Sequence, residues 1–250
     1  MAPAACRSIT SSPRARRAAP GTPRTFEIDW RVSGGKAALF FLNDRSKWRS
    51  VCLGGEGMPA EKQFDVDKVL DKAMQAFWAR GYEATSMQDL VDCTGVNRGS
   101  LYATYGDKHT LFLAALRMYD ETMRKKMLAE FEARFAPREA IRRLFLAFLE
   151  QASPKGCNRG CFLTNTALEL AAHDREARDI VAEAQTQIEA FFARMIRKGQ
   201  ESGDIARHMD PPKAASGLLA SLAGLVVLIR SRPEPMLLQA VVDDAVGRLG

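Results

Sequence analysis

Two cysteines four residues apart are the residues of this chain best suited to chemistry. Cys157 and Cys161 flank a loop that contains Gly160, and Lys155 and Arg159 place positive charge beside them. Cys161 stands where a helix is predicted to begin, and helix N-termini and nearby cations both stabilise the reactive thiolate. Cys157 is close enough to act as a resolving thiol. The pattern predicts either a redox or electrophile sensor or a purely structural Cys161.

The predicted helix from Cys161 to Ala172 adds an amide and a carboxylate to this thiol. Its three- and four-residue spacing places one set of side chains on a common face, namely Cys161, Asn165, Leu168, Glu169 and Ala172. Facing inward they line a mixed pocket, and facing outward they are surface residues. With Phe148 from the preceding apolar helix face, the candidate effector set is Cys157, Cys161, Asn165, Glu169 and Phe148.

Other catalytic chemistry has little support in the sequence. It contains no P-loop, dinucleotide-binding glycine fingerprint, zinc-protease motif or nucleophile elbow, and no His is next to a plausible nucleophile. Cys157, Cys161 and His173 lack standard zinc spacing, so no metal or cofactor is expected. The enzyme alternative that remains is a thiol-based redox enzyme using the two cysteines, and a binding protein is the favoured hypothesis.

A second set of polar residues lies between positions 65 and 112, where helix-capping residues separate short apolar stripes. The predicted N-caps are Asp65, Ser86, Asn97 and Asp107. Gly81 and Gly95 are predicted to end the first two helices. Two short helices joined by a glycine turn form a helix-turn-helix unit, whose second helix fits the major groove of DNA.

The second helix of this unit presents small and polar side chains outward, while Leu101 and Tyr105 point inward. Arg98 suits a guanine or a phosphate, and Gly99 suits a position that approaches DNA closely. Lys108, at the start of the fourth helix, suits a phosphate. Taken singly, each is equally compatible with a solvated surface.

The composition is that of a globular protein, with 46% hydrophobic and 26% charged residues. Five cysteines in no disulfide framework favour a reducing cytosol, so a cytoplasmic protein is expected. The longest uncharged apolar run, Ala214–Ile229, has 16 residues and is shorter than the roughly 20 that span a membrane. No membrane association is therefore expected.

The net charge of +6 lies entirely in the first part of the chain. Residues 1–57 hold 10 Lys and Arg against 4 Asp and Glu, and residues 58–250 hold 26 of each. Residues 1–57 lack helical periodicity, and Gly54-Gly55-Glu56-Gly57 encodes a purine-rich stretch before Met58 that resembles a ribosome-binding site. We therefore predict that translation starts at Met58. The alternative is a disordered basic arm that adds non-specific DNA affinity.

From Met58 onward the pattern is helical throughout, which predicts an all-α fold. It has a three-helix DNA-binding domain at 58–112 and a six-helix ligand-binding and dimerisation domain at 113–250. The fourth helix continues to Phe135, and later helices begin near Pro137, Arg175, Asp210 and Met236. Because the penultimate helix is apolar nearly all round, we expect a homodimer through the last two helices. The alternative is a buried core helix in a monomer.

Three runs carry a resemblance to a known family: residues 77–86 (FWARGYEATS), 94–102 (TGVNRGSLY) and 105–108 (YGDK). They resemble the TetR family of bacterial transcriptional repressors. The resemblance implies contacts to double-stranded operator DNA and release by a small-molecule effector. Together with the residues above, it gives the predicted DNA-binding set: Thr85, Ser86, Gln88, Asn97, Arg98, Gly99, Ser100, Tyr102, Thr104, Tyr105 and Lys108. Ala103-Thr104 departs from the aromatic or His residues of many members.

The Gly-Cys-Phe-Leu run at 160–163 resembles the NemR-like branch, in which a cysteine at this place senses electrophiles. Other members carry the same Gly-Cys without a redox role. The sequence thus predicts a ligand- or redox-responsive repressor that binds a palindromic operator as a homodimer.

Overall fold

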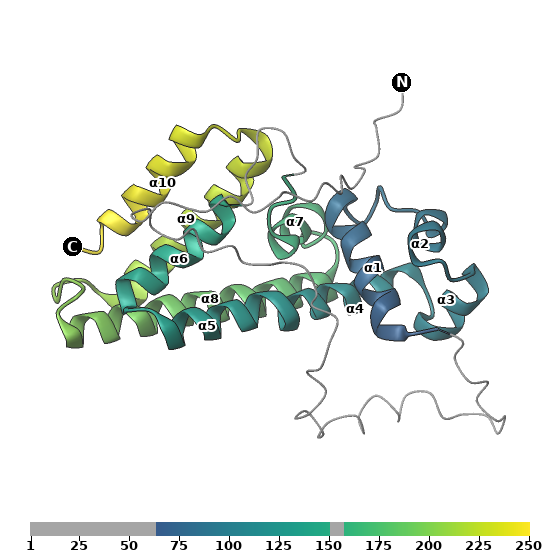
Figure 1. The fold of residues 1–250 in the computed structure, drawn as a ribbon, viewed down its shortest axis with the longest axis horizontal. Coiled ribbons are helices and arrows are strands. Elements are labelled where there is room, and N and C mark those ends of the chain that lie inside the picture. The colour runs from purple at the N-terminus through teal and green to yellow at the C-terminus, as the bar shows by residue number, and fades with distance from the viewer. Residues whose placement is uncertain (1–63, 151–157) are drawn as a thin grey trace, which may run out of the picture. The chain divides into compact units, whose positions relative to one another are not determined.

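The computed structural model describes residues 64–150 and 158–250. The predicted extension at 1–57 and Cys157 lie outside the described residues. Within the described part every regular element is helical, as the sequence predicted. The first three helices lie together at one end of the described part of the chain in Figure 1. They are α1 (Val66–Arg80), α2 (Met87–Thr94) and α3 (Arg98–Tyr105).

The predicted caps of these helices are confirmed. Asp65 Oδ1 accepts hydrogen bonds from the backbone N–H groups of Asp67 and Lys68 at 3.1 and 3.2 Å. Asn97 Oδ1 accepts from Ser100 N at 2.9 Å. These side chains satisfy N–H groups that a helix leaves without internal partners, so local sequence defines where α1 and α3 begin.

Gly95 ends α2 in the left-handed conformation, at φ +75°, and its N–H donates to Val91 O. This conformation strains residues that carry a Cβ. The tight turn that follows leads directly into the N-cap of α3. The helix-turn-helix predicted from the sequence is therefore present.

A buried apolar core holds the three helices on the start of the fourth. Phe77, Leu90, Leu101 and Phe112 are at most 1% exposed. The rings of Phe77 and Phe112 lie edge to face with centroids 5.1 Å apart, an arrangement that aromatic pairs prefer. The core sits on the inner sides of α1–α3, which leaves the outer side of α3 free.

The fourth helix leads from this domain into the second. It comprises α4 (Lys108–Tyr119), a π-helical turn η1 (Asp120–Lys125) and α5 (Lys126–Arg134). The sequence predicted a single regular helix here. The π turn differs from that prediction, and it buries the charged side chains of Asp120 and Arg124.

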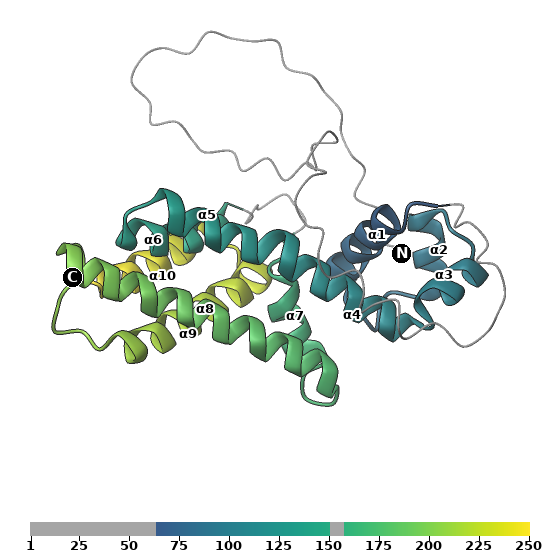
Figure 2. The same cartoon turned by 90° about the horizontal axis from the view of Figure 1, so that it is seen from below.

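Five further helices complete the second domain (Figures 1 and 2). They are α6 (Pro137–Leu149), α7 (Phe162–Glu169), α8 (Arg175–Ser202), α9 (Pro211–Ser231) and α10 (Pro235–Gly247). The predicted helix at 161–172 is shorter than expected, because turns after Glu169 lead to Asp174. Asp174 Oδ1 caps α8 by accepting from Ala177 N.

The helix α9 is longer than the apolar run that the sequence highlighted. Within the described residues it is the one helix long and apolar enough to cross a membrane by length and composition. One side of α9 is buried through Leu218, Leu222, Leu225 and Ile229, and it packs against α8, α6 and α10. On its other side Ser216, Gly217, Ala220, Gly224 and Val227 are exposed.

Candidate DNA-binding surface and its link to the second domain

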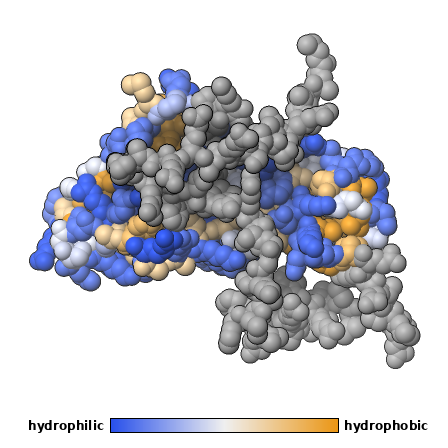
Figure 3. Space-filling view, in the orientation of Figure 1, coloured by the Kyte–Doolittle hydropathy of each residue, from blue (hydrophilic) through white to orange (hydrophobic). Residues whose placement is uncertain are grey.

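The outer side of α3 is the candidate recognition surface. Arg98, Gly99 and Ala103 are exposed, and Tyr102 is 42% exposed, which is unusual for so large a hydrophobic side chain. Figure 3 shows hydrophobic and hydrophilic patches side by side at this end of the molecule. Such a surface can make both hydrogen bonds and apolar contacts to base edges.

Among the described residues, no close contact requires glycine at position 99. A Cβ added to it would meet only Asn97 Oδ1, at 3.4 Å. Glycine is less favourable than alanine in a helix, by up to roughly 1 kcal/mol in the interior, and Gly99 lies in the first turn of α3. The position therefore keeps open space on the outer side of α3, next to Arg98 and Ser100.

Ser86 and Gln88 are exposed on α2, as expected, but both are also engaged locally. Ser86 forms the predicted capping box with Asp89, since its Oγ accepts from Asp89 N at 3.1 Å and its N donates to Asp89 Oδ2 at 2.8 Å. Hydrogen bonds from Ser86, and then the Arg80 guanidinium, lower the pKa of Asp89 to about 2. Gln88 Nε2 donates to Asp92 Oδ1 at 2.8 Å.

Two members of the predicted DNA-binding set turn inward. Thr85 is fully buried, and its hydroxyl donates to Gly81 O at 2.6 Å. The expectation that the Thr85 side chain contacts DNA is therefore corrected, because this side chain closes the α1–α2 connection. The Tyr105 hydroxyl donates to Val66 O at 3.2 Å, and burial raises its pKa to about 12.

Lys108 stands at the N-terminus of α4, where the sequence placed it. Its Nζ lies 4.2 Å from the centroid of the Tyr82 ring, a cation–π contact that holds the ammonium group in place. Asp107 caps the same helix by accepting from Thr110 N at 2.6 Å. Lys108 therefore presents a positive charge at the N-terminus of α4, a position suited to a phosphate.

Glu169 links the second domain to the first, which differs from its predicted place in an effector pocket. From the end of α7, Oε2 accepts from Tyr82 N at 3.1 Å and Oε1 accepts from Glu83 N at 2.9 Å. A Cβ on Gly81, whose φ is +91°, would lie 2.7 Å from Glu169 Oε2. Gly81 thus allows the carboxylate to bind the backbone directly after α1.

A second link joins α1 to the segment before α7. Trp78 Nε1 donates to Gly160 O at 3.0 Å, and both groups are buried. Arg159 lies with its guanidinium carbon 5.7 Å from the Trp78 ring centroid, and its Nη1 donates to Gln75 Oε1 at 2.6 Å. Arg159 therefore contacts α1, whereas the sequence placed its charge beside Cys161.

A third link joins the start of α4 to the start of α8. His109 Nε2 lies 2.6 Å from Asp174 Oδ2. Burial acts to raise the pKa of Asp174, yet hydrogen bonds from Ala177 N and His109 hold it below its usual value. Asp174 thus serves two elements, as the cap of α8 and as the partner of His109.

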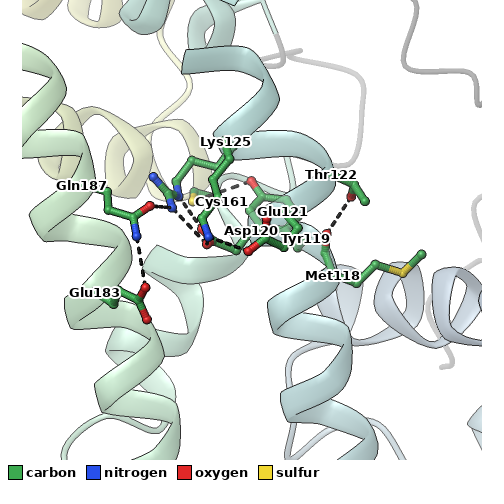
Figure 4. Close-up of polar contacts among 10 residues, drawn as sticks. Met118, Tyr119, Asp120, Glu121, Thr122, Lys125, Cys161, Glu183 and Gln187 are labelled. Atoms are coloured by element: carbon green, nitrogen blue, oxygen red, sulfur yellow. Dashed lines mark hydrogen bonds and ion pairs between the residues drawn. The ribbon is translucent and has the colours of Figure 1, made fainter. Parts of the chain in front are cut away.

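Cys161 lies in the buried region between these links. It is 6% exposed, and its Sγ accepts from Tyr119 Oη at 3.7 Å (Figure 4). Burial, followed by the contact with Cys161, raises the pKa of Tyr119 well above its usual value. The Tyr119 ring packs edge to face on Trp78, with 5.0 Å between the ring centroids. The Tyr119 side chain therefore connects Cys161 to Trp78 of α1.

Among the described residues, the predicted effector side chains lie in different surroundings. Asn165 is buried and donates from Nδ2 to Arg159 O at 2.8 Å, Leu168 is 70% exposed, and Phe148 is buried in α6. Glu169 points to the α1–α2 connection. Two residues of the predicted face, Asn165 and Leu168, do line one pocket together with Val226 and Arg230 of α9, but α7 ends at Glu169, before Ala172.

Sequence reasoning missed Trp78, Tyr119, His109 and Asp174 as linking residues. A tryptophan on a buried helix stripe has a polar N–H that needs an acceptor, and this was an available signal. The pairing of His109 with Asp174 had no local signal, since the two residues lie 65 positions apart.

Family models match both parts of the chain. Residues 69–115 match the model described as bacterial regulatory proteins of the tetR family, and residues 137–243 match the tetracyclin repressor-like C-terminal domain. The HTH-type transcriptional regulator YezE of Bacillus subtilis is 33% identical over 148 residues, which are 59% of this chain and 76% of that protein. The HTH-type transcriptional repressor ComR of Escherichia coli is 31% identical over 170 residues, or 68% of this chain and 81% of that protein.

Solved structures agree with this assignment. The TetR family regulator CifR, as a cysteine mutant in complex with a 26-base-pair operator DNA, is 28% identical with a TM-score of 0.67, covering 78% of this chain and all of that one. The reduced form of NemR from Escherichia coli has a TM-score of 0.67 at 17% identity, covering 74% and 96%, and supports the fold alone. The chain belongs to the TetR family of bacterial transcriptional regulators.

Proposed function

We propose that this protein is a cytoplasmic transcriptional repressor that binds a palindromic operator as a homodimer and is released by a chemical signal. Residues 58–112 form the DNA-binding domain, and residues 113–250 form the effector and dimerisation domain. The observation that carries the proposal is the outer side of α3. There Arg98 and Tyr102 project without an intramolecular partner among the described residues, beside the open space at Gly99.

DNA recognition follows from the geometry of this surface. α3 enters the major groove, with Arg98 and Tyr102 at the base edges. The remaining predicted contacts are to the sugar-phosphate backbone of the DNA, and they fix the orientation of the protein on the duplex. They come from Ser86, Gln88, Asn97, Ser100, Thr104 and Lys108. In a protein that starts at Met58, residues 58–250 carry no net charge, so the affinity depends on a few local phosphate contacts and its salt dependence is shallow.

The open sides of α9 and α10 support dimerisation. Within residues 64–150 and 158–250, no atom lies within 4 Å of a Cβ added to Gly217 or Gly224 on α9. On the same helix Val227 is 37% exposed, and Met236 on α10 is 88% exposed. An apolar surface with small residues allows two copies to approach closely, and a twofold axis through it matches a palindromic operator.

The signal passes through the contacts between the two domains. A small molecule in the second domain, or modification of the Cys161 thiol, moves α7 or the Tyr119 side chain of α4. Since α7 binds the backbone after α1 through Glu169, such a movement changes the position of the DNA-binding domain. The spacing of the two recognition helices then no longer fits the operator.

The function is tested with purified full-length protein and a fluorescent duplex from upstream of its own gene. We expect a saturable anisotropy change that an unlabelled copy competes away and a scrambled duplex does not. Sedimentation of the same sample is expected to show a dimer bound to each duplex. Equal affinity for the scrambled duplex would reject a sequence-specific repressor.

Thiol sensing is tested with Cys161→Ser, which keeps a small buried side chain. Hydrogen peroxide or a quinone is expected to release the unchanged protein from DNA and to leave the variant bound. Release of both proteins alike would reject Cys161 as the sensor. The alternative of a thiol redox enzyme needs Cys157, which lies outside the described residues, and a Cys161 thiol that is buried here.

A further inference from the structure

The π-helical turn η1 contains a buried charged pair in the helix that joins the two domains. Arg124 is 4% exposed and Asp120 is 9% exposed. Arg124 donates from Nε to Asp120 Oδ1 and from Nη2 to Asp120 Oδ2, the latter at 2.9 Å. Arg124 Nη2 also donates to Gln187 Oε1 of α8, at 2.6 Å. The guanidinium is therefore fixed between η1 and α8.

One nitrogen of this guanidinium lacks an acceptor. Arg124 Nη1 is buried and has no hydrogen-bond partner among the described residues. A buried donor without a partner is unfavourable, and native structures rarely leave one unexplained. π-helical turns within α-helices also occur frequently at functional sites. The two features coincide at one residue, which points to a missing oxygen acceptor.

A groove of about 290 Å³ lies beside Arg124. One wall is formed by η1 and α5, and the other wall is formed by α8. Arg124 and Lys125 line it beside the apolar Leu128, Ala129 and Ala190. In Figure 3 the lower edge of the molecule, over α5 and α8, alternates between hydrophobic and hydrophilic surface. The groove thus combines a cationic donor with a short apolar wall.

The acidic group that lines this groove is already engaged. Glu132 accepts from Arg194 at 2.9 Å and from Lys198 at 2.8 Å. These hydrogen bonds hold the pKa of Glu132 below its usual value, so it stays ionised and paired. The unmet requirement of the groove is therefore an acceptor for Arg124.

We propose that this groove binds a small organic carboxylate with a short apolar chain. One carboxylate oxygen accepts from Arg124 Nη1, a charge-assisted hydrogen bond that is stronger than one to a neutral acceptor. The apolar chain lies over Leu128, Ala129 and Ala190. The ligand contacts the same continuous helix whose N-terminal part, α4, carries Lys108 and His109. It therefore acts as an effector, a role that rests on the proposed function.

Binding is tested by isothermal titration of the full-length protein with hexanoate, and with hexan-1-ol as the uncharged probe. Ala190→Leu fills the groove from an exposed position of α8, and Arg124→Lys keeps the charge but removes Nη1. Ala182→Leu, exposed on the same helix outside the groove, is the matched control. We expect saturable hexanoate binding to the unchanged protein and to Ala182→Leu, at least tenfold weaker binding to the other two variants, and at least tenfold weaker binding of hexan-1-ol.

Absence of saturable hexanoate binding, or binding that Ala190→Leu leaves unchanged, would overturn the site. Equal affinity for hexan-1-ol would overturn the carboxylate. Saturating hexanoate is expected to change the affinity for operator DNA at least threefold in the unchanged protein and not in Ala190→Leu. An unchanged affinity overturns the effector role. If the protein binds no DNA in any condition, the proposed function fails, while the titration still decides the site.

Discussion

Two helices of eight residues, α3 and α7, use their polar side chains in opposite ways. On α3, Arg98 and Tyr102 project into solvent, and Gly99 leaves space beside them. On α7, Asn165 and Glu169 bind backbone groups of other segments. Unused hydrogen-bonding groups on an exposed face thus mark a recognition surface, whereas groups bound to other elements mark a connection between domains. Substitutions on the exposed face of α3 should therefore change DNA affinity, whereas substitutions at the contacts of α7 should change the free energy of unfolding.

The largest expected effect is at Gly81, where the α7 connection meets the first domain. Gly81→Ala places a Cβ at φ +91° and ψ 173°, a backbone region essentially restricted to glycine, and against Glu169 Oε2. We expect a loss of about 3 kcal/mol in the free energy of unfolding, from backbone strain and weakened hydrogen bonds to the carboxylate. Urea unfolding measures it.

Gly95→Ala is the comparison for that substitution, at a second glycine with a positive φ but in the left-handed α region. Gly95 has φ +75°, but an added Cβ would meet nothing within 4 Å. It therefore reports strain alone, and we expect a loss of about 1 kcal/mol. Equal losses for the two variants would show that the Glu169 contact contributes nothing.

On the recognition side, Arg98→Ala removes an exposed side chain of α3. We expect DNA affinity to fall about tenfold or more, as for the loss of a base contact worth roughly 1–3 kcal/mol. The free energy of unfolding should stay within about 0.5 kcal/mol, as for surface substitutions in general. Anisotropy titration and urea unfolding give the two values. Arg207→Ala, at an exposed arginine between α8 and α9, should change neither.

A smaller effect is expected for Trp78→Phe, which removes the hydrogen bond from Nε1 to Gly160 O and keeps an aromatic ring. We expect destabilisation of roughly 1–2 kcal/mol, since the buried Gly160 carbonyl loses its donor. The same change should alter the response of DNA binding to the effector. Unchanged stability in urea would mean that this hydrogen bond does not hold α1 to the segment before α7.

The smallest effect is expected for Asp174→Asn. Asn caps helices as well as Asp does, so the variant isolates the negative charge next to His109. We expect a loss below about 1 kcal/mol at neutral pH. Because the folded-state pKa of Asp174 is lowered, this stabilisation is present above the usual Asp pKa and is lost as pH falls through the lowered value. The difference in unfolding free energy between the two proteins should therefore persist from pH 7 down to about pH 4 and shrink only as pH falls further, through the lowered pKa.

The same contrast explains how much could be predicted from sequence. The caps at Asp65, Ser86 and Asn97 are local signals, because each side chain binds a backbone N–H two or three residues ahead. These signals are sufficient to define the helix-turn-helix and the outer side of α3. The burial of Thr85 was missed, because its hydroxyl pairs with a turn carbonyl that capping rules do not address.

The second domain was predicted less well, because its polar contacts join distant positions. Glu169 and Tyr82 are 87 residues apart, and Arg124 and Gln187 are 63 apart. The π turn had no sequence signal either, since the apolar pattern of the fourth helix continues through it. Helix boundaries follow from local patterns, but the partner of a buried carboxylate or guanidinium depends on the packed fold.

The most direct test is the selection of binding sequences from a random duplex library by the full-length protein. Recognition by α3 in a symmetric dimer predicts an enriched inverted repeat, with half-sites about one helical turn, or ~10 base pairs, apart. It also predicts that Arg98→Ala and Tyr102→Ala lose this enrichment. Enrichment of a single unrepeated site, or the same inverted repeat with both variants, would contradict this mode of recognition.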